Sequence, residues 1–223
     1  MIYAPHYPFT KSLTFRIIAV TFAVWIVQLV AYPFFDVFFA LNPDTPLPLG
    51  AYQLFTYMFL HATYAETSYG VVVYPAHIFA NMFVLAIFGF PLEQAIGRRK
   101  FMTIYIVSGM GSAIFYLFLM SFFGGPDALL LGASGAVFGV LAAYAFRFPK
   151  TWVYLLGFFP MPAAVMIVFL LAEEMFFGVL GLQPGIANFG HVGGIITGLL
   201  IMAFWKVKER RKNVWGEWEF IWE

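Results

Sequence analysis

The chain has 223 residues, of which 62% are hydrophobic, 10% are charged and none is cysteine. Soluble domains carry about 25% charged residues, and a soluble fold of this size cannot bury so much apolar surface. The composition therefore excludes a soluble enzyme, a nucleic-acid-binding protein and a disordered chain, and it places most of the chain in a lipid bilayer. The lack of cysteine excludes disulfides, thiolate metal sites and cysteine nucleophiles, and the net charge of +1 indicates no partner.

Six hydrophobic segments predict an all-α membrane protein with six transmembrane helices. They cover residues 13–35, 77–92, 101–123, 129–146, a part of 153–182, and 186–205. Most approach the roughly 20 residues that a membrane helix needs. We interpret the first as a retained helix, because it is long for a signal peptide and lacks a clear cleavage site. This interpretation divides the chain into an N-terminal segment (1–12), a membrane domain (13–205) and a basic, aromatic tail (206–223).

The basic residues predict the orientation of the helices. All twelve Lys and Arg residues lie near the start of the first segment, between the second and third, between the fourth and fifth, or after the sixth. Positively charged loops stay in the cytoplasm, so an even number of helices predicts that both termini are cytoplasmic. Because no targeting extension precedes the first helix, we expect the bacterial inner membrane.

Two further stretches are rich in aromatic residues. The connection 36–76 is too long for a simple loop, and we expect a structured loop that rests partly in the outer leaflet, since aromatic side chains favour the membrane interface. In the tail, Trp215, Trp218, Ile221 and Trp222 have helical spacing, which indicates an interfacial anchor; a disordered end is the alternative. No internal repeat is visible, and this disfavours an inverted-repeat transporter.

Polar side chains inside a membrane are costly and usually mark function. His77 and Asn81 fall in the second helix, Ser134 in the fourth and His191 in the sixth. A rise of 1.5 Å per residue places Ser134, His191 and His77 about 20, 22 and 24 Å from the cytoplasmic boundary. Because a serine alone is a weak nucleophile, a serine and a histidine at one depth predict a nucleophile and its general base.

Glycines support a close approach of the fourth and sixth helices. They recur four residues apart at Gly135 and Gly139, and at Gly190, Gly194 and Gly198. Ser134 stands at the expected start of its helix, where unpaired N–H groups and the helix dipole can stabilise an oxyanion. His77 and Asn81 can add donors to this hole. The alternatives are a serine bonded to a backbone carbonyl and structural histidines, and the shared depth argues against them.

Four motifs then occur in order along these helices: HIFAN from His77, EQAIGR from Glu93, GASG around Ser134 and HVGG from His191. Together they resemble the rhomboid family of intramembrane serine proteases over about two thirds of the chain. The resemblance implies a six-helix rhomboid bundle with Ser134 as nucleophile and His191 as base, a dyad without a carboxylate. It also implies an oxyanion hole made by His77, Asn81 and the Ser134 backbone N–H.

The resemblance extends to further residues and to the partners. Phe138 matches an aromatic position that supports the histidine ring, and Glu93 and Arg98 match a structural pair. The substrates implied are membrane-spanning segments of other proteins, cut without a metal or cofactor. The rival reading is a rhomboid-like pseudoprotease that binds membrane proteins without cleaving them, and such relatives lack the dyad. The oligomeric state and the physiological substrate stay open.

The sequence also departs from the family pattern. Tyr52 and Gln53 stand where many members carry Trp-Arg, and the stretch between His61 and His77 is longer than usual. We interpret His61 as a structural loop histidine. Glu173 and Glu174, in or near the fifth helix, are expected to line a water cavity; the alternative is a third partner for His191.

Overall fold

The computed structural model describes residues 8–46, 48, 50–68, 70–123, 129–155, 157–182, 187–208, 210–212 and 218–220. Among these, five helices are long and apolar enough to cross a membrane: α1 (Leu13–Ala31), α4 (Ala76–Ile96), α5 (Arg98–Phe123), α7 (Ala163–Leu180) and α8 (Asn188–Lys208). A further apolar helix, α6 (Ser134–Arg147), has 14 residues. The mostly helical architecture is confirmed, and α6 as a sixth crossing stays a prediction.

Proline and glycine explain where these helices differ from the predicted segments. α1 ends at Ala31, before Pro33, since a proline disfavours helix at the residue before it and cannot donate a helical hydrogen bond. α6 begins at Ser134, the expected helix start, five residues after its hydrophobic segment begins, because Gly132 has a φ of +135° and Leu130 pairs with Leu41 in an isolated bridge. In the fifth segment, a hairpin ending at Pro162 precedes α7.

Three short antiparallel hairpins, which the sequence did not predict, accompany the helices. They are β1 (Tyr64–Thr67) with β2 (Gly70–Val73), β3 (Trp152–Leu155) with β4 (Phe159–Pro162), and β5 (Arg210–Lys212) with β6 (Trp218–Phe220). The helical spacing in the tail predicted a helix at Trp218, but Trp218 lies in β6. The other residues of that pattern, Trp215, Ile221 and Trp222, fall outside the described residues.

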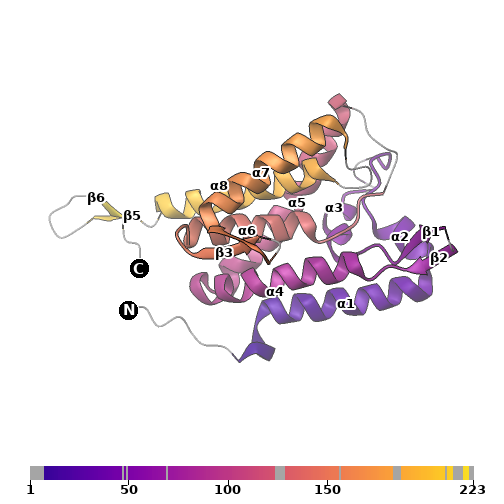
Figure 1. Ribbon diagram of the computed structural model, residues 1–223, viewed down its shortest axis with the longest axis horizontal. Helices are drawn as coiled ribbons and strands as arrows, with labels where there is room; N and C mark the ends of the chain where they lie inside the picture. Colours follow the sequence, from indigo (N-terminus) through magenta and orange to yellow (C-terminus); the bar gives the residue numbers. More distant parts are fainter. Residues whose placement is uncertain are drawn as a thin grey trace.

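The connection 36–76 is built from short elements. It contains most of α2 (Phe34–Phe39), then α3 (Gln53–Thr56), the 3-10 helix η2 (Tyr57–Phe59) and the β1–β2 hairpin; another 3-10 helix, η1 (Phe9–Lys11), precedes α1. The elements of the connection gather at one end of the bundle, while the start of α1 and the end of α8 lie at the other (Figure 1). Contact of this connection with the outer leaflet stays a prediction.

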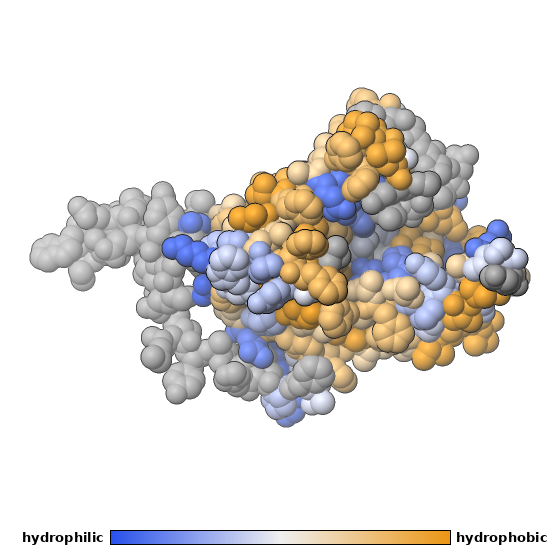
Figure 2. Space-filling model, viewed as in Figure 1, coloured by the Kyte–Doolittle hydropathy of each residue, from blue (hydrophilic) through white to orange (hydrophobic). Residues whose placement is uncertain are grey.

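The sides of the helices are apolar on the outside. Large hydrophobic residues are exposed on each of the five long helices, including Val30, Phe83, Phe118, Val168 and Leu200. Figure 2 shows hydrophobic residues over much of the visible face of the bundle. Such a surface is suited to lipid rather than to water, and the chain is a membrane protein.

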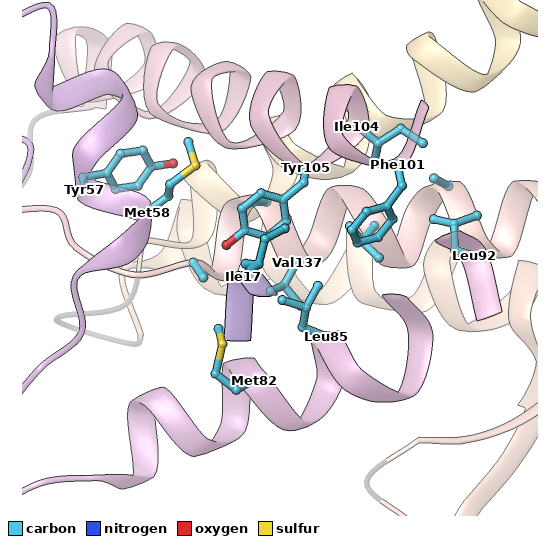
Figure 3. Packing of buried hydrophobic residues seen from close by; sticks show 14 of the residues in the cluster. Ile17, Tyr57, Met58, Met82, Leu85, Leu92, Phe101, Ile104, Tyr105 and Val137 are labelled. Atoms are coloured by element: carbon cyan, nitrogen blue, oxygen red, sulfur yellow. The ribbon is translucent and has the colours of Figure 1, made fainter. Parts of the chain in front are cut away.

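Inside the bundle, aromatic and aliphatic side chains from several elements pack together (Figure 3). Tyr57 enters this cluster from η2, and its hydroxyl donates a 2.7 Å hydrogen bond to the carbonyl of Gly109 on α5. This bond satisfies the buried phenol and fixes the loop elements to the helices.

The carboxylate of Glu93 ties α4 to the start of α1. It accepts hydrogen bonds from the backbone N–H groups of Leu13 and Thr14, at 2.8 Å each, and from the Thr14 hydroxyl. The Nε of Arg98 lies 3.8 Å from the same carboxylate. A carboxylate at a helix N-terminus satisfies unpaired donors and complements the helix dipole, so this pair has the structural geometry that the resemblance implied.

Helices α6 and α8 meet backbone to backbone. A Cβ added at Gly194 would overlap the carbonyl of Gly135, and one added at Gly198 would overlap the carbonyl of Gly139. The two glycine rows that the sequence shows therefore face each other. Only glycine permits this separation, which brings the side chains at the ends of the two helices within reach of each other.

Candidate active site

Ser134 is the first residue of α6, and His191 lies in the first turn of α8. The Oγ atom of Ser134 lies 2.8 Å from Nε2 of His191, which is hydrogen-bond distance. His191 is 9% exposed, and Ser134 is partly exposed. The structure thus brings together the serine and histidine that the depth estimate placed at one level.

The ring of Phe138 holds the imidazole of His191 in one plane. Phe138 follows Ser134 by one turn of α6, and the two rings stack with centroids 4.4 Å apart and an interplanar angle of 16°. Stacking restricts rotation of the imidazole about its Cβ–Cγ bond while leaving both ring nitrogens free to form hydrogen bonds.

The second ring nitrogen of His191 contacts a carboxylate. Its Nδ1 lies 2.8 Å from Oε1 of Glu174 on α7. The other oxygen of Glu174 accepts a 2.7 Å hydrogen bond from the side-chain amide of Asn188. We expected Glu174 to line a water cavity. It does not, because it is only 6% exposed. Asn188 was not singled out from the sequence; its one signal is its position three residues before His191.

His77, at the start of α4, points a donor toward Ser134. Its Nδ1 accepts the backbone N–H of Ala62 at 3.3 Å, so a neutral ring carries its proton on Nε2. A Cβ added at Gly132 would lie 3.0 Å from this Nε2 and 3.8 Å from the Ser134 Oγ. The Nε2–H group therefore faces the space beside the nucleophile.

Asn81 lies one turn further along the same face of α4. Its Nδ2 donates a 2.9 Å hydrogen bond to the carbonyl of His77, and the side-chain amide has a second proton to donate. The structure thus places Asn81 behind His77, with half of its donor capacity used within the helix.

The segment before Ser134 is fixed by four hydrogen bonds to its backbone. Leu130 exchanges two hydrogen bonds with Leu41, the N–H of Gly132 donates to the Tyr57 carbonyl, and the N–H of Ala133 donates to Nε2 of His61. The first N–H groups of a helix have no partner inside that helix, so the start of α6 presents donors at Ser134. His61 acts here as the structural loop histidine that we expected.

Burial, with a smaller contribution from the nearby His77 ring, lowers the pKa of His61 from 6.5 to about 3. The folded protein therefore resists protonation of His61, whereas the unfolded chain accepts a proton once the pH falls below about 6.5. Stability should fall between these two values as the pH decreases, by about 2 kcal/mol from pH 6.5 to pH 5. Thermal unfolding in detergent at both pH values measures this loss. His61→Gln should lose less than the native protein, and an equal loss in both would contradict the assignment.

Within the described parts of the chain, no three histidine or acidic side chains lie close enough to hold a metal ion. The chemistry that the described geometry offers is that of a hydroxyl nucleophile beside an imidazole, with donors arranged around the nucleophile.

Comparison with known proteins identifies the family of the chain. The family model of the Rhomboid domain matches residues 48–207, and the chain belongs to the rhomboid family. RHOMBOID-like protein 6, mitochondrial, of Arabidopsis thaliana is 32% identical over 67% of this chain and 42% of the relative. Rhomboid protein 1, mitochondrial, of Saccharomyces cerevisiae is 31% identical over 64% of this chain and 43% of the relative.

A third relative carries an activity in its name. Rhomboid-type serine protease 2 of Emericella nidulans is 30% identical over 71% of this chain and 27% of the relative. The chain thus spans less than half the length of each of these three relatives. All three come from plants or fungi, so they do not support the expectation of a bacterial inner membrane.

Proposed function

We propose that this protein is an intramembrane serine endopeptidase that cleaves membrane-spanning segments of other proteins. The observation that carries the proposal is the 2.8 Å contact between Ser134 Oγ and His191 Nε2. A serine needs a base at this distance to act as a nucleophile. Membership of the rhomboid family and the name of the Emericella relative support the same reaction.

In the proposed mechanism, the Ser134 oxygen attacks the carbonyl carbon of the scissile peptide bond while Nε2 of His191 accepts the hydroxyl proton. The imidazolium then donates that proton to the leaving amine, and an acyl-enzyme remains on Ser134. His191 next takes a proton from water, which attacks the ester and releases the new carboxyl end. The serine recovers its proton, so the enzyme returns to its starting state.

Each attack places negative charge on the carbonyl oxygen. The Ser134 backbone N–H at the start of α6, the Nε2–H of His77 and the Asn81 amide are the proposed donors. Donors that are already oriented stabilise such an oxyanion without reorganising. The scissile bond must first leave its helix, because a helix satisfies its own carbonyls. We therefore expect small or helix-breaking residues near the cut.

The same proposal fixes the orientation in the membrane. Basic residues lie at the start of α5, at the end of α6 and at the end of α8. With six crossings, we infer that this end of the bundle and both termini face the cytoplasm. Ser134 then lies toward the opposite surface, and cleavage releases the outer part of the substrate.

His77→Ala should slow cleavage by roughly 10²–10³-fold, because one donor of several is lost. The rate should fall without a loss of folded protein, which a thermal unfolding midpoint verifies. Asn81→Ala should act in the same direction. Turnover equal to that of the native protein in a folded His77→Ala variant would exclude His77 from the oxyanion hole, and a loss of folding in Asn81→Ala would assign Asn81 a structural role.

A cleavage assay against a panel of single-span proteins in liposomes tests the proposed function. We expect at least one substrate to yield two fragments whose masses locate the cut in or beside the membrane segment. Ser134→Ala should yield none, since it keeps the fold and removes only the nucleophile. If the native protein cleaves no member and also fails to react with a serine-directed reagent, the pseudoprotease reading replaces this one.

A further inference from the structure

The carboxylate of Glu174 has no role in a serine–histidine dyad, yet the structure gives it a defined place. It projects from α7 toward α8, is only 6% exposed, and lies 2.8 Å from Nδ1 of His191. A buried carboxylate is costly unless its oxygens are hydrogen bonded. The Asn188 amide meets this need at the second oxygen, at 2.7 Å.

These contacts form a chain that ends at the nucleophile. Asn188 and His191 lie one turn apart on α8, so the same helix supplies both side chains that contact the Glu174 carboxylate. The chain runs from Asn188 through Glu174 and His191 to Ser134, with successive contacts of 2.7, 2.8 and 2.8 Å. The adjacent carboxylate, Glu173, is partly exposed.

We propose that Glu174 is a positioning residue that completes a Ser134–His191–Glu174 triad, held in place by Asn188. This proposal rests on the proposed protease function and changes its machinery, because the resemblance implies a dyad without a carboxylate. A carboxylate at Nδ1 can only accept, so it retains the proton there and leaves Nε2 free to accept the proton of Ser134. Its negative charge also stabilises the imidazolium that forms when Ser134 attacks.

Asn188 makes the replacement of Glu174 by glutamine informative. A glutamine keeps the size of the side chain but has one acceptor and one donor end. The NH₂ group of Asn188 donates to the glutamine oxygen, and this turns the glutamine NH₂ toward Nδ1 of His191. This donor favours the tautomer with its proton on Nε2, which cannot accept from Ser134. Glu174→Gln therefore removes the negative charge and also favours the wrong tautomer.

The double variant Glu174→Gln, Asn188→Asp separates these two effects. An aspartate at position 188 accepts from the glutamine NH₂, so the glutamine oxygen faces Nδ1 and favours a proton on that atom. The productive tautomer is restored, while the charge beside the imidazole is not. Partial recovery of activity in the double variant is a result that a purely structural role of Glu174 does not produce.

The experiment compares kcat and KM for liposome cleavage of one single-span substrate. Glu174→Gln should lower kcat roughly 10²–10⁴-fold with KM little changed, and the double variant should recover a measurable part of it. Glu173→Gln is the matched control and should keep native activity. A folded Glu174→Gln variant with native kcat overturns the triad while native cleavage leaves the protease function standing. Loss of kcat without any recovery in a folded double variant overturns the positioning role.

A measurement on the native protein covers the case in which the variants do not fold. ¹⁵N NMR of histidine-labelled protein in detergent at neutral or higher pH, with His191→Gln used to assign the signal, reports which ring nitrogen of His191 carries the proton. We expect the proton on Nδ1. A neutral ring with its proton on Nε2 would overturn the proposal. If the native protein neither cleaves a substrate nor reacts with a fluorophosphonate, the proposed function itself has failed, and this outcome is distinct from the failure of the triad.

Discussion

His191→Ala should lower the rate at which a fluorophosphonate reacts with the protein by at least about 10³-fold. The reagent needs an activated serine, and the imidazole 2.8 Å from Ser134 Oγ is the proposed acceptor of its proton. Alanine removes the proposed base together with its stacking on Phe138 and its contact with Glu174. These are side-chain contacts, so the helical content should not change. Time-resolved labelling in detergent and in liposomes measures the rate.

Two controls accompany this prediction. Ser121→Ala alters an exposed serine on α5 and should leave labelling unchanged, whereas Ser134→Ala should abolish it. Circular dichroism verifies that each variant is helical. Undiminished labelling in a folded His191→Ala protein would show that His191 does not activate the serine.

Gly198→Ala should destabilise the protein and slow cleavage, although position 198 lies two turns from His191. Its methyl group would overlap the carbonyl of Gly139, and backbone at a helix contact yields only if the two helices separate. Overpacking of this kind costs about 1–3 kcal/mol. Separation of α6 from α8 also moves His191 away from Ser134, and a displacement near 1 Å can cost roughly 10²-fold in rate.

The matched control for this prediction is Leu200→Ala on the same helix. Leu200 is 64% exposed on the outside of the bundle, so its truncation should change the unfolding midpoint and the cleavage rate little. Equal stability and activity in Gly198→Ala and the native protein would mean that the two helices do not need this close approach.

Much of the site could be predicted because it depends on helix geometry. The helix rise places Ser134, His77 and His191 at one depth, and small residues four apart predict which helices approach closely. Both relations follow from the regular spacing of residues along a helix. The structure brings these three side chains together around the start of α6.

The Glu174 contact could not be derived in the same way. Its helix begins after a hairpin, and the alternation that forms β3 and β4 is hidden in a long apolar stretch. Without the start of α7, neither the depth nor the face of Glu174 can be calculated. The position of Asn188, which distinguishes a held carboxylate from a cavity lining, depends on the tertiary packing of α7 against α8.

The ends of the helices were also difficult to predict, for a related reason. The hydrophobic segments continue past Ala31 and begin before Ser134, since loop residues near a membrane surface can be as apolar as the helices. Hydropathy marks which residues avoid water, whereas Pro33 and the positive φ of Gly132 decide where helical hydrogen bonding stops.

Locating the covalent adduct of a fluorophosphonate on the native protein in liposomes tests directly whether Ser134 is activated. Digestion and mass spectrometry identify the modified residue. An activated nucleophile at the start of α6 predicts a single adduct on Ser134, formed at neutral pH and absent when a competing transmembrane substrate is in excess. An adduct on another serine, or no adduct on protein that is folded, would contradict the claim that Ser134 is an activated nucleophile.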